Sequence, residues 1–465
     1  MIKEATISES ISPSQTAYID LMHELGLEFT ISNFWIFHGT FSYDKTWLLF
    51  VSYRVSDGIK ILKPLLLALK KRKCSFRLTQ SPQTNYGVNC GDFGINELGK
   101  SLTIFTKSDE EAVEIYQQLK PITDVVDGPQ ILGCLKLSKN IYALRSEIHN
   151  FNQIGSISTA MSMQIPKDKS LIPFKINKKS YNYWKPKKII GRCYIPIKII
   201  SQHGKGTTYK AISLKHLSFK PVIVKHGKMY EGEDHWGRDI RDRLSWEHQL
   251  SIEIQDHIPT AKVIEYRTNR TESWLVLEFV EGKTISSIID ELINQNLSWA
   301  TLNKKSKIWL LSIYLKILDI IQNLHNRRIV HRDISDRNFL ITPTDQVIIL
   351  DFELAHALVA KKPMPPFQLG TAGYVSPEQL NFEIPNDISP DLYSLGALLT
   401  LLITFEAPAK LLKANLPEVK EEIIRKSLDR DLSEIICSTL DTPKKRPPLQ
   451  LIKNTIEQKI KSYEI

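Results

Sequence analysis

The sequence predicts an α+β protein in which a mixed α/β domain precedes a two-lobed domain. At 465 residues the chain is too long for one ordinary hydrophobic core. Strand-type and helix-type apolar runs alternate in its first part, whereas short strand-like runs precede long amphipathic helices in its last part. We therefore expect an N-terminal domain followed by a sheet-rich lobe and a helix-rich lobe with a cleft between them.

The N-terminal domain is expected over residues 1–165. Its strands and helices are predicted at four runs: TWLLFVSYR and SLTIFT as strands, IKILKPLLLALKKRK and DEEAVEIYQQLK as helices. Pro and Lys then interrupt the apolar periodicity, so residues 166–190 are the expected linker.

The two-lobed domain is expected over residues 191–465, with the sheet-rich lobe at 191–281 and the helix-rich lobe at 282–465. The strand-like runs YIPIKII, PVIVK and SWLVLEFV belong to the first lobe, and KIWLLSIYLKILDIIQNLHN is a long amphipathic helix of the second.

The segment HRDISDRN, residues 331–338, carries the densest chemical signal. An apolar strand, FLI, follows it, and Asp351 comes thirteen residues after Asn338 in IILDFE. Transfer of a phosphoryl group requires a carboxylate that orients the attacking hydroxyl and oxygen ligands that hold Mg²⁺ against the phosphates. Asp333, Asn338 and Asp351 offer these groups, and their spacing resembles the protein-kinase signature.

The resemblance to protein kinases extends upstream. Lys225 ends the strand-like run PVIVK and looks like the lysine that holds the α- and β-phosphates of ATP. Glu247, twenty-two residues later in a helix-like segment, would fix that lysine through an ion pair. The resemblance implies a bilobal kinase fold that uses ATP and Mg²⁺.

The adenine and phosphate contacts are also expected from this resemblance. LVLEFVEG looks like the hinge, with Leu277 as gatekeeper and backbone groups of Glu278 and Val280 pairing with adenine. Leu340, in the strand after the expected catalytic loop (residues 331–338), completes the expected nucleotide site. The phosphate loop SQHGKGTTYKA retains only Gly204 and Gly206 of the usual three glycines, which implies a looser cover over the phosphates.

The helix-rich lobe shows three further kinase features and one departure. GTAGYVSPEQ resembles the end of an activation segment, Asp391 matches the residue that anchors the catalytic-loop backbone, and Arg446 suits the arginine that pairs with Glu378. The metal motif is DFE, with Glu353 in place of glycine. Since glycine permits the backbone to flip at this position, Glu353 argues against regulation by such a flip.

DFE, HRDIS, GTAGYVSPE and VKHGKMYEGEDHWGRDIRDRLSWEHQL together resemble the kinase domain of class III and IV lanthipeptide synthetases. In that family a phospho-Ser/Thr lyase domain precedes the kinase, and a zinc-dependent cyclase follows it. The resemblance implies a peptide substrate whose Ser and Thr are phosphorylated. Few residues follow Arg446 and no Cys-His set suits zinc, so ring closure is expected from a separate cyclase.

The N-terminal domain resembles the lyase domain more weakly and departs from it where chemistry would be done. The family's K-x-H strand motif falls on Leu48 and Phe50, neither of which can transfer a proton. A further family lysine appears as Arg77. Lys100 and Arg145 could still bind an anionic phosphate, so the domain is expected to be a degenerate lyase that retains a binding role.

Composition limits the partners and the location. The net charge of +10 comes from scattered lysines without interleaved aromatics, which argues against nucleic-acid binding. The chain has neither a signal peptide at its start nor an apolar run of about 18 residues that could span a membrane. A cytoplasmic protein is therefore expected, with its five widely spaced cysteines reduced.

Three functions remain open at this point. The first is a peptide-directed Ser/Thr kinase of the lanthipeptide-synthetase type, and the second is a free-standing signalling Ser/Thr kinase. The third is a nucleotide-binding pseudokinase scaffold. The activation-segment motif GTAGYVSPEQ argues against small-molecule kinases of the antibiotic type, which share the catalytic core.

Overall fold

The computed structural model divides into two compact units. The first comprises Met1–Phe219, Lys225–Asp242 and Arg267–Trp274, and the second comprises Lys220–Val224, Arg243–Tyr266 and Leu275–Ile465. The structure describes residues 14–465 apart from 42–45, 95, 147–162, 183–188, 192, 204, 216–218, 368, 382 and 413–414. The α+β fold class expected from the sequence is confirmed.

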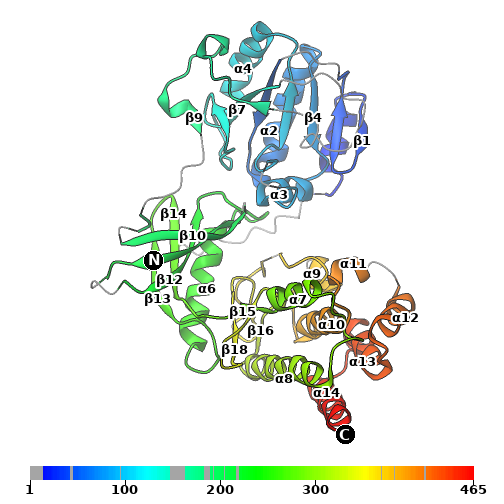
Figure 1. The fold of residues 1–465 in the computed structure, drawn as a ribbon. Helices are drawn as coiled ribbons and strands as arrows, with labels where there is room; N and C mark the ends of the chain where they lie inside the picture. Colours follow the sequence, from blue (N-terminus) through cyan, green and yellow to red (C-terminus); the bar gives the residue numbers. More distant parts are fainter. Residues whose placement is uncertain are drawn as a thin grey trace. The chain divides into compact units, whose positions relative to one another are not determined.

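A large sheet forms the N-terminal part of the first unit (Figure 1). Within the described residues it has nine strands in the order β1-β2-β4-β5-β3-β7-β6-β9, with β8 paired to β7. The strands are β1 (Thr30–Ser32), β2 (Trp35–His38), β3 (Trp47–Val51), β4 (Ser75–Thr79), β5 (Leu102–Phe105), β6 (Cys134–Lys136), β7 (Ile141–Ser146), β8 (Met163–Gln164) and β9 (Tyr181–Asn182). The strands predicted at TWLLFVSYR and SLTIFT are β3 and β5.

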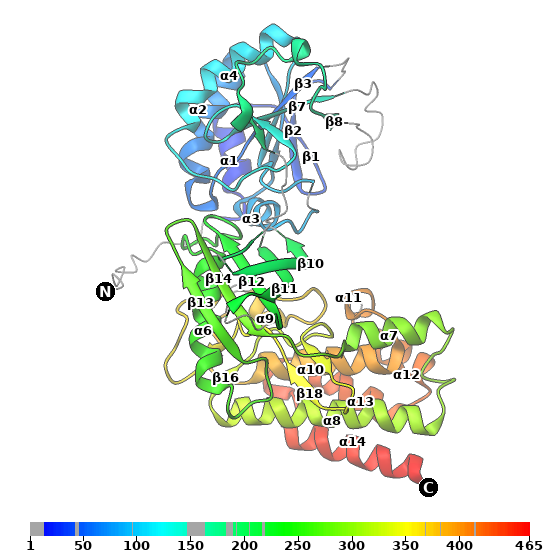
Figure 2. The ribbon, with the colours of Figure 1, turned by 60° about the vertical axis from the view of Figure 1, so that its left-hand side comes forward.

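Helices lie along one face of this sheet, where α1, α2 and α4 run side by side (Figures 1 and 2). The helices of this part are α1 (Ala17–Glu24), α2 (Gly58–Lys71), α3 (Pro82–Cys90) and α4 (Asp109–Thr123), with short 3-10 turns at Val55–Asp57, Lys169–Leu171 and Lys178–Ser180. Both predicted helices, α2 and α4, are present. α4 begins where the Ser108 side chain accepts a hydrogen bond from Glu111 N. Three acidic residues in its first turn stabilise the helix further, because their negative charges are attracted to the positive N-terminal end of the helix dipole.

The central strand β3 is buried along its whole length, which explains its continuous apolar sequence. The core around it also includes Ile172 and Phe174, which lie inside the expected linker. The Phe174 ring packs edge-on against Trp47 with the centroids 5.1 Å apart. In this Lys- and Pro-rich segment only isolated apolar residues reach the core, and such spacing gives no periodic signal.

A second sheet carries the sheet-rich lobe. Its strands follow the order β10-β11-β12-β14-β13, and helix α6 (Ile240–Ile254) comes between β12 and β13 in the chain. The strands are β10 (Tyr194–His203), β11 (Gly206–Ser213), β12 (Pro221–Lys228), β13 (Val263–Thr268) and β14 (Glu272–Glu278). The three strands predicted from sequence are β10, β12 and β14.

One ion pair within the first unit links segments far apart in the chain. Arg54, which precedes α2, donates from Nε to both carboxylate oxygens of Glu233, at 2.8 and 2.7 Å. Glu233 lies between β12 and α6, and its side chain is 2% exposed. The Arg54 guanidinium also lies over the Tyr230 ring, 5.2 Å from its centroid. Because the Glu233 carboxylate is buried, it requires this partner.

Helices dominate the second unit (Figure 2). Its elements are β15 (Lys283–Thr284), α7 (Ile285–Asn294), α8 (Lys304–Asn326), β16 (Ile329–Val330), β17 (Phe339–Ile341), β18 (Val347–Ile349), β19 (His356–Ala357), α9 (Pro377–Leu380), α10 (Ser389–Thr404), α11 (Pro408–Leu411), α12 (Leu416–Ser427), α13 (Arg430–Leu440), the 3-10 turn Pro443–Lys445 and α14 (Leu449–Glu464). The predicted long helix is α8. Apolar faces of α8, α10, α13 and α14 meet in one core, which supports the loops at the ends of the short strands.

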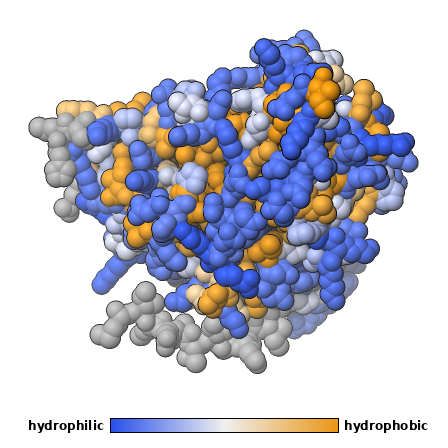
Figure 3. All heavy atoms as spheres, turned by 90° about the horizontal axis from the view of Figure 1, so that it is seen from below, coloured by the Kyte–Doolittle hydropathy of each residue, from blue (hydrophilic) through white to orange (hydrophobic). Residues whose placement is uncertain are grey.

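The face seen in Figure 3 is mostly hydrophilic, with apolar residues scattered among charged ones. In the described part of the chain, no helix combines the length and the apolar character that crossing a bilayer requires.

Candidate active site

The loop 331–338 joins β16 to β17 and presents Asp333. One oxygen of its carboxylate, Oδ1, accepts hydrogen bonds from the backbone N and the hydroxyl of Thr371, at 3.0 and 2.8 Å. Asn338 Nδ2 donates to the other oxygen, Oδ2, at 2.9 Å, and to Asp333 O at 2.7 Å. The carboxylate is therefore held from two sides, and the structure brings together Asp333 and Asn338 as the sequence predicts.

Asp351 lies close enough to Asp333 to affect its charge. Burial raises the pKa of Asp333, and the negative charge of Asp351 raises it further, while the bonds from Thr371 and Asn338 act in the opposite direction. Two neighbouring carboxylates repel each other unless a cation lies between or beside them. The arrangement therefore favours the binding of a positive ion.

The donor atoms also fit a hard divalent cation. Both amide hydrogens of Asn338 are used in its bonds to Asp333, which leaves the side-chain oxygen Oδ1 as the atom that can coordinate an ion. Together with the Asp351 carboxylate it would offer oxygen ligands, the kind that Mg²⁺ prefers.

Asp391, at the start of α10, anchors the backbone of this loop. Its carboxylate accepts hydrogen bonds from the N–H groups of His331 at 2.9 Å and Arg332 at 2.8 Å, and it contacts His325 Nε2 at 2.8 Å. Burial tends to raise the pKa of Asp391, but the bond with His325 and the other donors outweigh it and hold the pKa below its usual value. The predicted anchoring role of Asp391 is confirmed by these bonds.

Two residues of the site have left-handed backbone conformations. Arg332 has φ +65° and Asp351 has φ +64°, values that residues with a Cβ seldom adopt. Arg332 Nη1 donates to the carbonyl oxygens of Leu354 at 3.2 Å and Phe367 at 2.9 Å, which secures its conformation. Backbone strain of this kind persists only where the surroundings impose it, and it is concentrated at functional sites.

The segment after Asp351 is packed inward. Phe352 is buried, and its ring contacts the His331 ring with the centroids 5.3 Å apart. Glu353 N donates to Asp351 Oδ1 at 3.4 Å. In addition, Leu350 N donates to Asn338 O at 2.8 Å, which ties the strand before Asp351 to the end of the catalytic loop. Both predicted metal ligands are thus positioned by one short hairpin.

The expected adenine-binding residues all belong to the second unit. Leu277 is buried at the end of β14, whereas Glu278 is exposed and Val280 is half-buried. Glu278 N donates to Lys262 O at 2.8 Å, which fixes the backbone at the end of β14. Leu340 is half-buried on β17. Their contacts to adenine stay predictions.

The residues expected to hold the phosphates come from β11, β12 and α6. Gly206 begins β11 with φ +115°, and a Cβ there would lie 2.9 Å from His226 O, so only glycine fits. Gly204 falls outside the described residues. Lys225 lies on β12, and Glu247 is buried on α6. The ion pair expected between these two residues stays a prediction.

In the N-terminal part, the structure brings Phe50, Arg77 and Lys100 together. The Lys100 ammonium lies 4.4 Å from the centre of the Phe50 ring, and burial lowers the pKa of Lys100. Arg77 forms a buried ion pair with Glu97 and stacks on Trp35. Because its guanidinium is 2% exposed and already paired, Arg77 has little capacity left for a phosphate.

Arg145 lies on the other face of the sheet. Residues directly opposite in paired strands share a face, and Phe50 is opposite both Thr103 and Tyr142, while Arg77 is also opposite Thr103. Arg145 is three residues from Tyr142 and therefore points to the opposite side. It pairs instead with Asp109 at 4.0 Å and Leu171 O at 3.1 Å. The three predicted phosphate ligands do not form one cluster.

The sequence patterns did not identify two residues of the site, Thr371 and Arg243. Thr371 holds the Asp333 carboxylate, and its place directly after Gly370 in the recognised GTAGYVSPEQ segment was a usable signal. Arg243 is fully buried on α6 and pairs with Glu353, with Nε and Oε2 3.5 Å apart. The two residues of this pair are 110 positions apart in the chain, so no local pattern indicates the contact.

Comparison with known proteins places this geometry in a family. A model of the protein kinase domain matches residues 197–460, more than half of the chain. The chain belongs to the protein kinase family. A model described as the RamC N-terminal domain matches residues 32–144 of the preceding region.

Several bacterial kinases resemble this protein kinase. A probable serine/threonine-protein kinase of Clostridium perfringens is 25% identical over 297 residues, which cover 58% of this chain and 41% of the relative. Serine/threonine-protein kinase C of Synechocystis is 26% identical over 231 residues, 48% of this chain and 41% of the relative. A probable serine/threonine-protein kinase of Streptomyces coelicolor is 34% identical over 175 residues, 37% of this chain and 24% of the relative. The matched part is thus less than half the length of each relative.

Proposed function

We propose that this protein kinase transfers the γ-phosphoryl group of ATP to Ser or Thr hydroxyls of a peptide or protein. The observation that carries the proposal is the carboxylate of Asp333, held on one oxygen by Thr371 and on the other by Asn338, beside Asp351. A carboxylate fixed in this way can orient a hydroxyl and accept its proton as the phosphoryl group transfers.

The remaining roles follow from the chemistry of each group. Asn338 and Asp351 would hold Mg²⁺, which when bound neutralises phosphate charge. Lys225, held by Glu247, would orient the α- and β-phosphates, and Gly206 would let the backbone approach them. Leu277, Glu278, Val280 and Leu340 would contact adenine, with the Glu278 carbonyl oxygen accepting a hydrogen bond from the base.

We further propose that the substrate is a precursor peptide, as in lanthipeptide synthetases. The match of residues 32–144 to the RamC N-terminal domain supports this, because it falls within the N-terminal domain whose sequence resembles the lyase domain. Leu48 and Phe50 are both buried in β3, so neither position offers a proton-transfer group. In this proposal the N-terminal domain binds peptide without eliminating phosphate, and a separate cyclase closes the rings.

A free-standing signalling kinase is the second candidate. The similar proteins of Clostridium perfringens and Synechocystis are named serine/threonine-protein kinases, which favours protein substrates in general over one precursor peptide.

Radiolabel transfer from γ-labelled ATP in the presence of Mg²⁺ tests these proposals. The substrates are a synthetic Ser- and Cys-rich peptide and a general protein substrate such as casein, with Asp333→Asn as the blank. Preferential labelling of the peptide supports the lanthipeptide-type role, whereas preferential labelling of casein supports a signalling kinase. ATP binding with no transfer to either would contradict the proposed activity and indicate a pseudokinase.

A further inference from the structure

A buried arginine of helix α6 is paired with the acidic residue that replaces glycine in the metal motif. Arg243 is fully buried, and its Nε lies 3.5 Å from Oε2 of Glu353, whose side chain is 19% exposed. A buried guanidinium is costly unless a negative group compensates it. Glycine at position 353 could not supply that charge, so Glu353 has a specific partner in this fold.

A second contact joins the same two segments. Trp246 Nε1, three residues after Arg243, donates to Ala355 O at 2.8 Å. Residues three apart lie on the same side of a helix, so two successive turns of α6 are attached to residues 353–355. Two contacts along the axis restrict rotation and sliding of this part of the helix more than one contact would.

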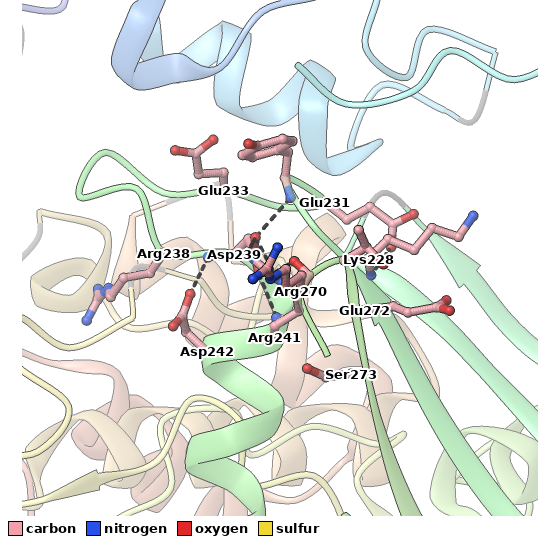
Figure 4. A network of polar contacts seen from close by, with 12 residues as sticks. Lys228, Glu231, Glu233, Arg238, Asp239, Arg241, Asp242, Arg270, Glu272 and Ser273 are labelled. Carbon is pink, nitrogen blue, oxygen red and sulfur yellow. Dashed lines mark hydrogen bonds and ion pairs between the residues drawn. The ribbon is translucent and has the colours of Figure 1, made fainter. Parts of the chain in front are cut away.

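Glu247 lies on the same side of α6, one turn after Arg243, and is buried. A shift of α6 that broke the Arg243 contact would therefore also displace Glu247. The helix start is fixed separately within the first unit, where Asp239 N donates to Asp242 Oδ2 at 2.8 Å and Tyr230 N donates to Asp239 Oδ2 at 2.9 Å (Figure 4). Asp239 also pairs with Arg241.

Glu353 also touches the metal-binding side of this segment. Its backbone N donates to Asp351 Oδ1, while its side chain reaches Arg243. Phe352, between them, is buried against His331. One residue thus connects the carboxylate expected to bind Mg²⁺ with the helix that carries Glu247.

We propose that Glu353 and Arg243 are positioning residues for phosphoryl transfer. Their ion pair holds α6 and the Asp351 segment in one fixed arrangement. This inference rests on the proposed kinase function, because its effect on rate can be seen only in an active enzyme. Small misplacement of reacting groups is enough to matter, since about 1 Å can cost about 100-fold in rate.

The test compares Glu353→Gln with the wild-type chain in steady-state phosphoryl transfer. The amide keeps the shape and removes the charge, so kcat should fall about tenfold or more while the KM for ATP changes by less than about threefold. Glu353→Asp, which keeps the charge, should recover part of the rate. The double variant with Arg243→Met should lose little more than Arg243→Met alone, because the two residues act through each other.

Hydrogen exchange of the amides of 240–254 provides a readout that does not depend on activity. We expect faster exchange there in Glu353→Gln and no change in Glu291→Gln, a control on α7 whose carboxylate forms an exposed ion pair with Lys283. If the wild-type chain transfers no phosphate, the kinase proposal fails, and exchange alone still tests the pair. A Glu353→Gln variant with wild-type kcat and wild-type exchange overturns the inference. So does a loss of activity that Asp does not rescue and that accompanies global unfolding in thermal melts.

Discussion

Arg446 and Glu378 form a buried ion pair in the helix-rich unit. Arg446 donates from Nη2 to Glu378 Oε2 at 3.1 Å and from Nη1 to the other carboxylate oxygen, and also to Ser389 O at 2.9 Å. The Arg446 side chain is 1% exposed. Burial tends to raise the pKa of Glu378, but the bonds from Arg446 and nearby donors hold it below its usual value. This pair was predicted from sequence and ties the end of the activation segment to the turn before α14.

Arg446→Met should destabilise the helix-rich unit by about 3–5 kcal/mol, because it leaves the Glu378 carboxylate partly buried and unpaired. Chemical denaturation followed by circular dichroism measures the loss. Arg425→Met is the matched control, since Arg425 pairs with Glu422 on the surface of α12 and its removal should change the stability far less than Arg446→Met does. Equal losses in both variants would contradict the importance of the buried pair.

Asp333→Asn and Asp351→Asn should each lower phosphate incorporation at least about 100-fold without unfolding the chain. The first change removes the proposed proton acceptor, and the second removes a charge from the proposed metal ligand. Radiolabel transfer measures the rate, and thermal melting confirms folding. Asp319→Asn, on the exposed side of α8, should keep full activity. Activity retained in either site variant would contradict the proposed roles of Asp333 and Asp351 in phosphoryl transfer.

Lys225→Met should lower turnover sharply while nucleotide binding weakens much less. Positioning of the phosphates matters more in the transition state than in the bound ground state. Single-turnover rates and binding of a fluorescent ATP analogue separate the two effects. Normal turnover in this variant would mean that another lysine holds the phosphates.

Incubation of a peptide substrate with the enzyme, Mg²⁺ and ATP should yield phosphopeptide and not dehydroalanine. Leu48 and Phe50 cannot accept the α-proton that elimination requires, and Arg77 is charged and paired with Glu97. Mass spectrometry distinguishes the products. A phosphopeptide is heavier than the unmodified peptide, whereas a dehydroalanine peptide is lighter than the unmodified peptide by one water. Prompt formation of dehydroalanine would show that other residues, Lys100 first among them, supply a base.

Acidification should destabilise the helix-rich unit through His356. Burial lowers the pKa of His356 to about 4, and the Arg332 charge acts in the same direction. The folded-state pKa of His356 lies below its unfolded value of about 6.5. The stability contributed by the neutral imidazole is therefore complete above pH 6.5 and is lost as the pH falls towards 4. The loss attributable to this residue should approach about 3 kcal/mol.

Denaturation curves at several pH values test this, with His356→Gln expected to show a shallower decline than the wild-type chain. His257→Gln, at an exposed position, serves as the control. Parallel declines in wild type and His356→Gln would rule out this source of acid sensitivity.

The sequence was most informative where function requires particular residues at fixed spacing. Asp333, Asn338 and Asp391 could be placed because the catalytic loop and α10 have recognisable local patterns, and the long apolar periods of α4 and α8 predicted those helices. Contacts set by tertiary packing were out of reach. The pairing of Arg243 with Glu353 depends on how α6 packs, and the face on which Arg145 lies depends on the register of β7 against β3, which one residue of shift would reverse.

The left-handed conformations at Arg332 and Asp351 imply a conflict between activity and stability within the site. Each left-handed conformation costs about 1–2 kcal/mol more for a residue with a Cβ than for glycine, so glycine would be less strained at both positions. An Asp351→Gly chain should therefore be at once inert and harder to unfold than Asp351→Asn. Contacts of the surrounding loop hold Asp351 in this strained backbone conformation. The free energy of that strain lowers the stability of the fold in exchange for a correctly placed carboxylate.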